Sequence, residues 1–155
     1  MKTMLLTLFI LSNFLYQPSP HSETNQSATA TEISSPKLEY PDNQRKSFVE
    51  VDAFYKKLDK DIYEEYKNAT FSMRKKVSFK EVPDVELTFK IKTKLDNKKM
   101  NPIDSTIHPN RQVYFLASFH QNEKEEFHKY VVIDAETKTV LLKGNHYHLY
   151  ENPYK

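Results

Sequence analysis

The chain contains no cysteine and no tryptophan, and it has a single glycine among its 155 residues. Without cysteine the protein cannot form disulfides, thiolate metal sites or a cysteine nucleophile. The near absence of glycine argues against glycine-rich phosphate-binding loops, and the sequence contains neither a G-x-S-x-G nor an H-E-x-x-H motif. These absences predict a protein that works by binding and not as an enzyme.

Neither sign of charge is in large excess. The chain has 23 Lys and Arg against 21 Asp and Glu, which gives a net charge of +2. This charge is too small to indicate a nucleic-acid or membrane partner by itself. Ten Tyr and ten Phe residues supply bulky side chains for a packed core. We therefore expect a globular domain with no specific affinity for nucleic acid.

The N-terminal region has the pattern of an export signal. Lys2 precedes an apolar run over residues 4–16, whose length is typical of a signal peptide and short for a membrane span. A small-residue cleavage site follows at Ala28-Thr29-Ala30. We expect a secretory signal peptide over residues 1–30, with a retained membrane anchor as the alternative. The protein would then be secreted or extracytoplasmic, with membrane contact only through this segment.

A spacer and one folded domain are expected after the signal. Residues 31–43 are rich in Ser, Thr, Pro and Asn and have no apolar periodicity, which predicts a flexible spacer. Residues 44–155 are then a single α+β domain. The bias toward Lys, Asn, Tyr, Phe and Ile resembles that of secreted proteins from AT-rich bacterial genomes.

The clearest helical pattern covers residues 47–68. Ser47 and Glu50 have the spacing of a capping box, in which the two side chains satisfy opposite backbone N–H groups. Apolar side chains then recur at steps of three and four residues: Phe48, Val51, Phe54, Tyr55, Leu58, Ile62 and Tyr66. This spacing predicts an amphipathic helix that covers a sheet.

After residue 70 the apolar period changes to two, the spacing of a half-buried strand. The alternation predicts strands over residues 71–80 and 85–95, joined by a turn at Pro83 and Asp84. A more apolar strand is expected over residues 111–121, and a hairpin over residues 127–144 has its turn at residues 134–137. Residues 145–154 extend or follow the last strand. The predicted fold class is α+β, with one N-terminal amphipathic helix packed on an antiparallel sheet of about five strands.

This order of elements resembles the cystatin-like and NTF2-like families, in which a helix packs across a curved antiparallel sheet. The segment YVVIDAETKTVLL, residues 130–142, is similar to the strand-turn-strand ending of PepSY-type modules. These resemblances imply a fold and no particular activity. The Gln-x-Val-x-Gly loop of cystatins is missing, because Gln112 and Val113 lie inside a predicted strand with no glycine nearby. Protease inhibition is therefore not implied.

Four histidines suggest an alternative function in metal binding. His146 and His148 lie two residues apart on a predicted strand, so that both imidazoles point to one face and could bind zinc or copper. His120 and His128 bracket a short loop and are expected to approach each other across the hairpin. The competing interpretation is that these are surface histidines and that the protein has no cofactor.

Basic side chains suggest a second kind of site. If the predicted turn at Pro83 sets the register, four basic side chains share the outward face of one hairpin, with Lys76 opposite Lys90 and Arg74 opposite Lys92. Like charges at such short range destabilise a sheet, so the stripe either binds an anionic envelope component or is a solvated edge that discourages strand addition.

The long connection over residues 96–110 is the third candidate region, since loops of this length are uncommon without a task. Its candidate binding residues are Ile103, Asp104 and His108. A small hydrolase using Asp104, Ser105 and His108 ranks last, because proximity in sequence is not triad geometry. The sequence therefore predicts an exported binding protein whose partner is another protein or an anionic envelope component, engaged through this loop, the basic face or an exposed sheet edge.

Overall fold

The computed structural model describes residues 37–96, 98–101 and 104–150. The predicted signal peptide, residues 31–36 of the predicted spacer, and Ile103 lie outside the described residues. Among the helices that the structure describes, none combines the length and the apolar character needed to cross a membrane.

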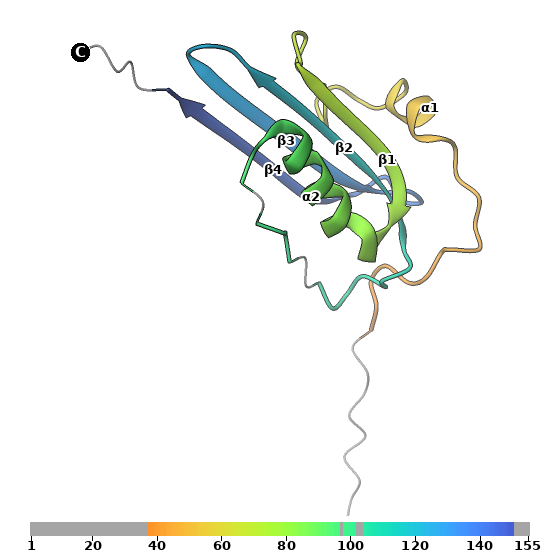
Figure 1. Cartoon of the computed structure of the whole chain (residues 1–155). Coiled ribbons are helices and arrows are strands. Elements are labelled where there is room, and N and C mark those ends of the chain that lie inside the picture. Colours follow the sequence, from red (N-terminus) through yellow and green to blue (C-terminus); the bar gives the residue numbers. More distant parts are fainter. Residues whose placement is uncertain (1–36, 97, 102–103, 151–155) are drawn as a thin grey trace, which may run out of the picture. The chain divides into compact units, whose positions relative to one another are not determined.

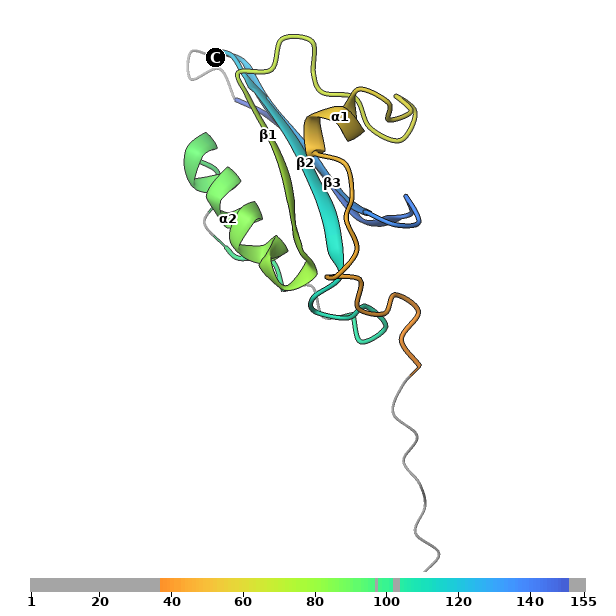
Figure 2. The ribbon, with the colours of Figure 1, turned by 90° about the vertical axis from the view of Figure 1, so that its right-hand side faces the viewer.

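The domain is built on one antiparallel sheet of four strands, in the order β1-β2-β3-β4. Their bounds are Phe71–Ser78 for β1, Gln112–Gln121 for β2, Glu125–Asp134 for β3 and Val140–Leu149 for β4. Helix α2 (Val82–Thr93) covers one face of the sheet, and a segment that contains the short helix α1 (Val51–Tyr55) covers the other (Figure 1, Figure 2). We call these the α2 face and the α1 face. The predicted α+β class and antiparallel sheet are confirmed, with four strands in place of five.

The sequence pattern located all four strands of the sheet. Alternation over residues 71–77 puts Met73 in the core of the α2 face, while Arg74 and Lys76 point to the α1 face. β2 is buried along most of its length, which agrees with its apolar sequence and with a position between β1 and β3. The hairpin of β3 and β4 has its turn close to the predicted place, and β4 extends to Leu149.

The predicted strand over residues 85–95 is wrong, because this segment is helix α2. Ser78 and Glu81 form a capping box ahead of it, and Pro83 stands in its first turn. The buried positions are Val82, Glu86, Phe89 and Thr93, which have helical spacing. Two of these four residues are polar, so a pattern based on apolar residues alone matched a period of two.

The predicted helix over residues 47–68 is also wrong in length. Only Val51–Tyr55 is helical, and Glu50 is the N-cap without a side-chain capping bond. The Glu50 carboxylate instead pairs with Lys76 on β1 at 2.6 Å. The segment still covers the sheet, because Phe54 is buried and its ring stacks on Tyr114 with centroids 4.0 Å apart. The predicted layer exists as an irregular segment.

A buried ion pair connects the two ends of the central hairpin. Arg111, directly before β2, donates two hydrogen bonds to Asp134 at the end of β3, one of them at 3.0 Å. The Asp134 carboxylate also accepts hydrogen bonds from the backbone N–H groups of Glu136 and Thr137 in the following turn. This cluster joins β2, β3 and the turn into one unit.

Candidate functional site

Strand β4 is an exposed edge of the sheet. In the part of the chain that the structure describes, β4 pairs with β3 and no strand pairs with its other side. Two large side chains near its end, Tyr147 and Leu149, are 56% and 57% exposed. The outer edge of β4 thus presents unpaired backbone N–H and C=O groups beside apolar side chains, the arrangement to which an extended chain can pair.

A cavity of about 500 Å³ lies on the α2 face beside β4. We call it the α2 pocket. Helix α2, the connection after it, β3 and β4 line this pocket. Its lining residues are Glu86, Lys90, Asp96, Lys98, Lys99, Met100, Asn101, His128, Tyr130, Gly144 and Asn145.

The only glycine of the chain shapes this pocket. Gly144 pairs with Tyr130 across β3 and β4, and a Cβ atom at Gly144 would lie 2.5 Å from Cε1 of the Tyr130 ring. The ring therefore occupies the place that any side chain at position 144 would need. Glycine here permits close packing of an aromatic ring on the edge strand.

Glu86 is the most deeply buried charged group of the α2 pocket, with 3% of its side chain exposed. One carboxylate oxygen pairs with Lys90, one helical turn further along, at 2.5 Å. The other oxygen, Oε2, is buried and has no hydrogen-bond partner among the described residues. A buried carboxylate oxygen without a donor is costly, so this atom has an unmet demand for a hydrogen bond.

Two further groups of the pocket have shifted proton affinities. Burial, reinforced by the nearby Glu86 charge, raises the pKa of the Tyr130 hydroxyl, which is therefore a donor at neutral pH. Burial, together with the charges of His146 and Lys90, lowers the pKa of His128. His128 is thus neutral at pH 7, and its buried Nδ1 atom has no hydrogen-bond partner among the described residues.

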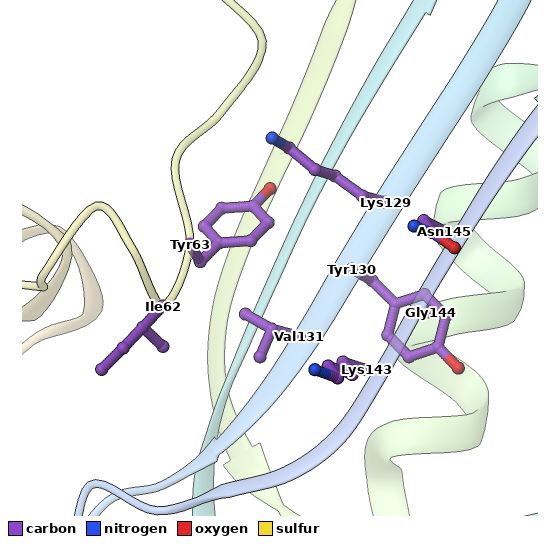
Figure 3. A pocket seen from close by; sticks show the side chains of 8 residues that line it. All are labelled: Ile62, Tyr63, Lys129, Tyr130, Val131, Lys143, Gly144 and Asn145. Atoms are coloured by element: carbon purple, nitrogen blue, oxygen red, sulfur yellow. The ribbon is translucent and has the colours of Figure 1, made fainter.

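A second cavity, of about 350 Å³, lies on the α1 face beside the same part of β4. We call it the α1 pocket. Figure 3 shows Tyr63 and Lys129 at one side of it and Lys143 at the other. The Lys129 ammonium lies over the rings of Tyr66 and Tyr63, at 4.3 and 5.6 Å from their centroids, and these cation–π contacts fix its position. Burial raises the pKa of Tyr63, whose hydroxyl is buried and unpaired among the described residues.

The two pockets meet the edge at the same point. Gly144 and Asn145 of β4 line both of them. Successive side chains of a strand point to opposite faces of a sheet. A strand paired with β4 would therefore direct one side chain toward the α2 pocket and its neighbour toward the α1 pocket.

The predicted basic stripe does not exist, because its two halves belong to different elements. Arg74 lies on the α1 face and pairs with Glu65 at 2.7 Å and with Asp52 at 3.0 Å. Lys76 shares that face and contacts the segment around α1. The other two basic residues are on α2, where Lys90 pairs with Glu86 and Lys92 lies over the Phe71 ring at 5.7 Å. These four side chains therefore do not form one anion-binding face.

The structure brings together two of the four predicted metal ligands. His128 and His146 are cross-strand partners on the α2 face, with ring centroids 5.3 Å apart. The expected approach of His120 to His128 is wrong, since β2–β3 pairing places His128 beside Phe119 and His120 on the opposite face. His148 pairs with Glu126, nearer the end of β4. Within the described ranges, no three His, Asp or Glu side chains are grouped as a metal site would require.

The connection over residues 96–110 serves the fold in its second half. Its backbone pairs with Tyr40 near Ile107, and the His108 Nδ1 atom accepts a hydrogen bond from the Asn110 N–H. The Asp104 carboxylate accepts hydrogen bonds from the Thr106 hydroxyl and N–H, which lower the pKa of Asp104. Asp104 and His108 thus have local partners of their own and do not form a catalytic pair. In its first half the connection contributes to the α2 pocket.

Sequence reasoning missed the residues that define the α2 pocket, namely Glu86, Tyr130 and Gly144. A glycine inside a strand often marks a close approach of another group, and this signal was available at Gly144. Nothing in a single sequence shows that Glu86 is buried, because glutamate is almost never fully buried without a partner.

No protein-family model, curated protein or solved structure matches this chain. The resemblance to cystatin-like, NTF2-like and PepSY-type modules therefore stays a prediction, and no activity of those families is carried to this protein. Function must be argued from the geometry of the site.

Proposed function

We propose that this protein is an exported binding protein that pairs an extended segment of a partner protein with the outer edge of β4. The observation that carries this proposal is the exposed edge of a ten-residue strand with a pocket on each face at the same position. In strand addition, main-chain hydrogen bonds supply affinity, and pockets for alternate side chains supply specificity. Both requirements are present at β4.

The charge of β4 favours a different protein as the partner over a second copy of this chain. β4 contains one lysine, Lys143, and no acidic residue. Lys129 adds a further positive charge beside it on the α1 face. Two copies paired edge to edge would bring these basic groups together, which costs free energy. A segment with neutral or acidic side chains toward the α1 face fits better.

A backbone-directed experiment tests this function. Peptides selected from a random linear library displayed on phage, with the full chain as bait, are resynthesised with single N-methyl groups at successive positions. Strand addition uses every second peptide N–H, so N-methylation at alternate positions should abolish binding and at the intervening positions should leave it nearly unchanged. Amide hydrogen exchange should show new protection in β4 and none in β1.

Two outcomes contradict the proposal. The first is binding that is equally sensitive, or equally insensitive, to N-methylation at all positions, since that indicates recognition by side chains alone. The second is a homodimer that protects the β4 amides without any peptide, measured by sedimentation and hydrogen exchange, since that makes a second copy the occupant.

Export is a separate part of the proposal and has its own test. The pattern of residues 1–30 supports a signal peptide. Expression with a C-terminal tag should yield a tagged chain outside the cytoplasm, with an N-terminus near residue 31 by mass spectrometry. A full-length chain confined to the cytoplasm contradicts export.

A further inference from the structure

The α2 pocket contains an acceptor and a donor that the protein leaves without hydrogen-bond partners in its described residues. The acceptor is Glu86 Oε2, on a side chain that is 3% exposed. The donor is the Tyr130 hydroxyl, which is protonated at neutral pH and makes no hydrogen bond within the described residues. A group that enters this pocket binds most favourably if it donates a hydrogen bond to Glu86 Oε2 and accepts one from the Tyr130 hydroxyl.

The charges around the pocket disfavour a charged group. Glu86 already pairs with Lys90, and the cavity is lined by one further acidic side chain, Asp96, and by two further lysines, Lys98 and Lys99, the second of which pairs with Asp84. An incoming ammonium or guanidinium would therefore bring a second cation to Glu86 and add to a lining with three basic and two acidic side chains. An incoming carboxylate would face the buried Glu86 carboxylate, at short range and away from water. An apolar group would leave Glu86 Oε2 and the neutral His128 without partners, at a cost of desolvation.

Resting on the function proposed above, we infer that the α2 pocket receives the primary amide side chain of a glutamine or asparagine in the added segment. The amide N–H₂ donates to Glu86 Oε2, and the amide oxygen accepts from the Tyr130 hydroxyl. A neutral amide carries both functions in one planar group and brings no charge. A cavity of about 500 Å³ holds such a side chain and water with it.

The test varies the peptide side chain that enters the α2 pocket and, separately, the Glu86 carboxylate that it is expected to contact. In a peptide that binds β4, the residue with nuclear Overhauser contacts to Tyr130 and His128 is synthesised as Gln, Glu and Leu. For the wild-type protein we expect the Gln peptide to bind at least about tenfold more tightly than either other peptide, because a hydrogen bond to a charged group contributes this much.

The protein variant Glu86→Gln should reverse part of this preference, since an amide at position 86 can donate to a peptide carboxylate. We expect the Gln-to-Glu affinity ratio to fall by about tenfold or more. The control is Glu64→Gln, a partly exposed acidic residue on the other side of the sheet that pairs with Lys60, and it should keep the wild-type ratio. Tyr130→Phe retains the ring and should reduce the Gln-to-Leu ratio by about fivefold.

The outcomes separate this inference from the proposed function. Equal affinity of the Gln and Leu peptides, with the alternating N-methyl pattern intact, overturns the amide assignment and leaves strand addition standing. An unchanged Gln-to-Glu ratio in a folded Glu86→Gln protein also overturns it. If Glu86→Gln does not fold, an unchanged Gln-to-Leu affinity ratio in Tyr130→Phe overturns the amide assignment instead. Absence of any peptide pairing at β4 overturns both proposals.

Discussion

The two edge strands of this sheet, β1 and β4, are built in opposite ways. β1 has eight residues, three of them consecutive basic residues, Arg74, Lys75 and Lys76. Its side chains are held on both faces, by Met73 in the core of the α2 face and by Arg74 in ion pairs on the α1 face. β4 has ten residues and one lysine, and a pocket flanks it on each face.

The two edges of the sheet therefore differ in how open they are to pairing with another chain. Consecutive charges on an edge strand discourage the pairing of another chain, and β1 carries them where both faces are already covered. β4 lacks such protection where neither face is fully covered. Stability is therefore expected to be concentrated around β1, β2 and the start of the central hairpin, and the proposed binding edge is β4.

The largest expected effect is at the buried Arg111–Asp134 ion pair, which joins β2, β3 and the following turn. Asp134→Ala leaves the buried Arg111 guanidinium with less compensation and removes the acceptor for two turn N–H groups. We expect the free energy of unfolding to fall by about 3 kcal/mol or more, measured by urea denaturation. Glu125→Ala, which removes a hydrogen bond to the exposed Tyr147 hydroxyl, is the control and should change it by less than about 0.5 kcal/mol. Similar losses of unfolding free energy in both variants would contradict the view that stability is concentrated around β1, β2 and the start of the central hairpin.

A direct comparison of the two edges uses one truncation on each. Met73→Ala on β1 removes a side chain that is 7% exposed, and Leu149→Ala on β4 removes one that is 57% exposed. The first should destabilise the protein by about 2 to 4 kcal/mol and the second by less than about 0.5 kcal/mol. Thermal and urea unfolding give both values, and comparable losses would show that β4 also supports the core.

Gly144→Ala tests the pocket side of β4 with a smaller effect on stability. The added methyl group meets the Tyr130 ring at 2.5 Å, so the ring must move into the α2 pocket or away from β4. We expect a loss of about 1 to 3 kcal/mol in the free energy of unfolding, together with weaker binding of the selected peptides. Asn145→Ala, at the next position of the same strand, is the control and should leave stability within about 0.5 kcal/mol. A fully stable Gly144→Ala protein would show that the close approach of Tyr130 is unimportant.

The strands of the sheet were predictable because burial and sequence period agree in them. β1 alternates between apolar and polar residues except at Lys75, and β2 is apolar because both of its faces are covered. The charge pattern alone could not show which edge strand is protected. It placed Lys76 and Arg74 opposite Lys90 and Lys92 in a predicted hairpin that the structure does not contain. Which strands are edges follows from strand order, and strand order was not readable from one sequence.

Helix α2 could have been predicted from its start, although not from its apolar residues. Ser78 and Glu81 form a capping box, and Pro83 follows in the first helical turn. The capping box was instead assigned to Ser47 and Glu50, where the same spacing carries no such bond. The apolar residues of this segment suggested a strand because two polar residues, Glu86 and Thr93, occupy buried positions of the helix.

The smallest expected effect is the pH dependence of the Arg111–Asp134 pair. Burial opposes ionisation of Asp134, but hydrogen bonds from Arg111 and from the N–H groups of Thr137 and Glu136 outweigh it and lower the pKa below the ordinary 3.8. A lowered folded-state pKa stabilises the protein fully above the unfolded value, and this stabilisation is lost as the pH falls through the folded value. One such group contributes at most about 1.4 kcal/mol per pH unit. Urea unfolding measured from pH 5 downward should therefore show, below about pH 4, a steeper loss of stability for the wild type than for Asp134→Asn. Equal slopes for the two proteins would show that stability does not depend on the charge of the Asp134 carboxylate.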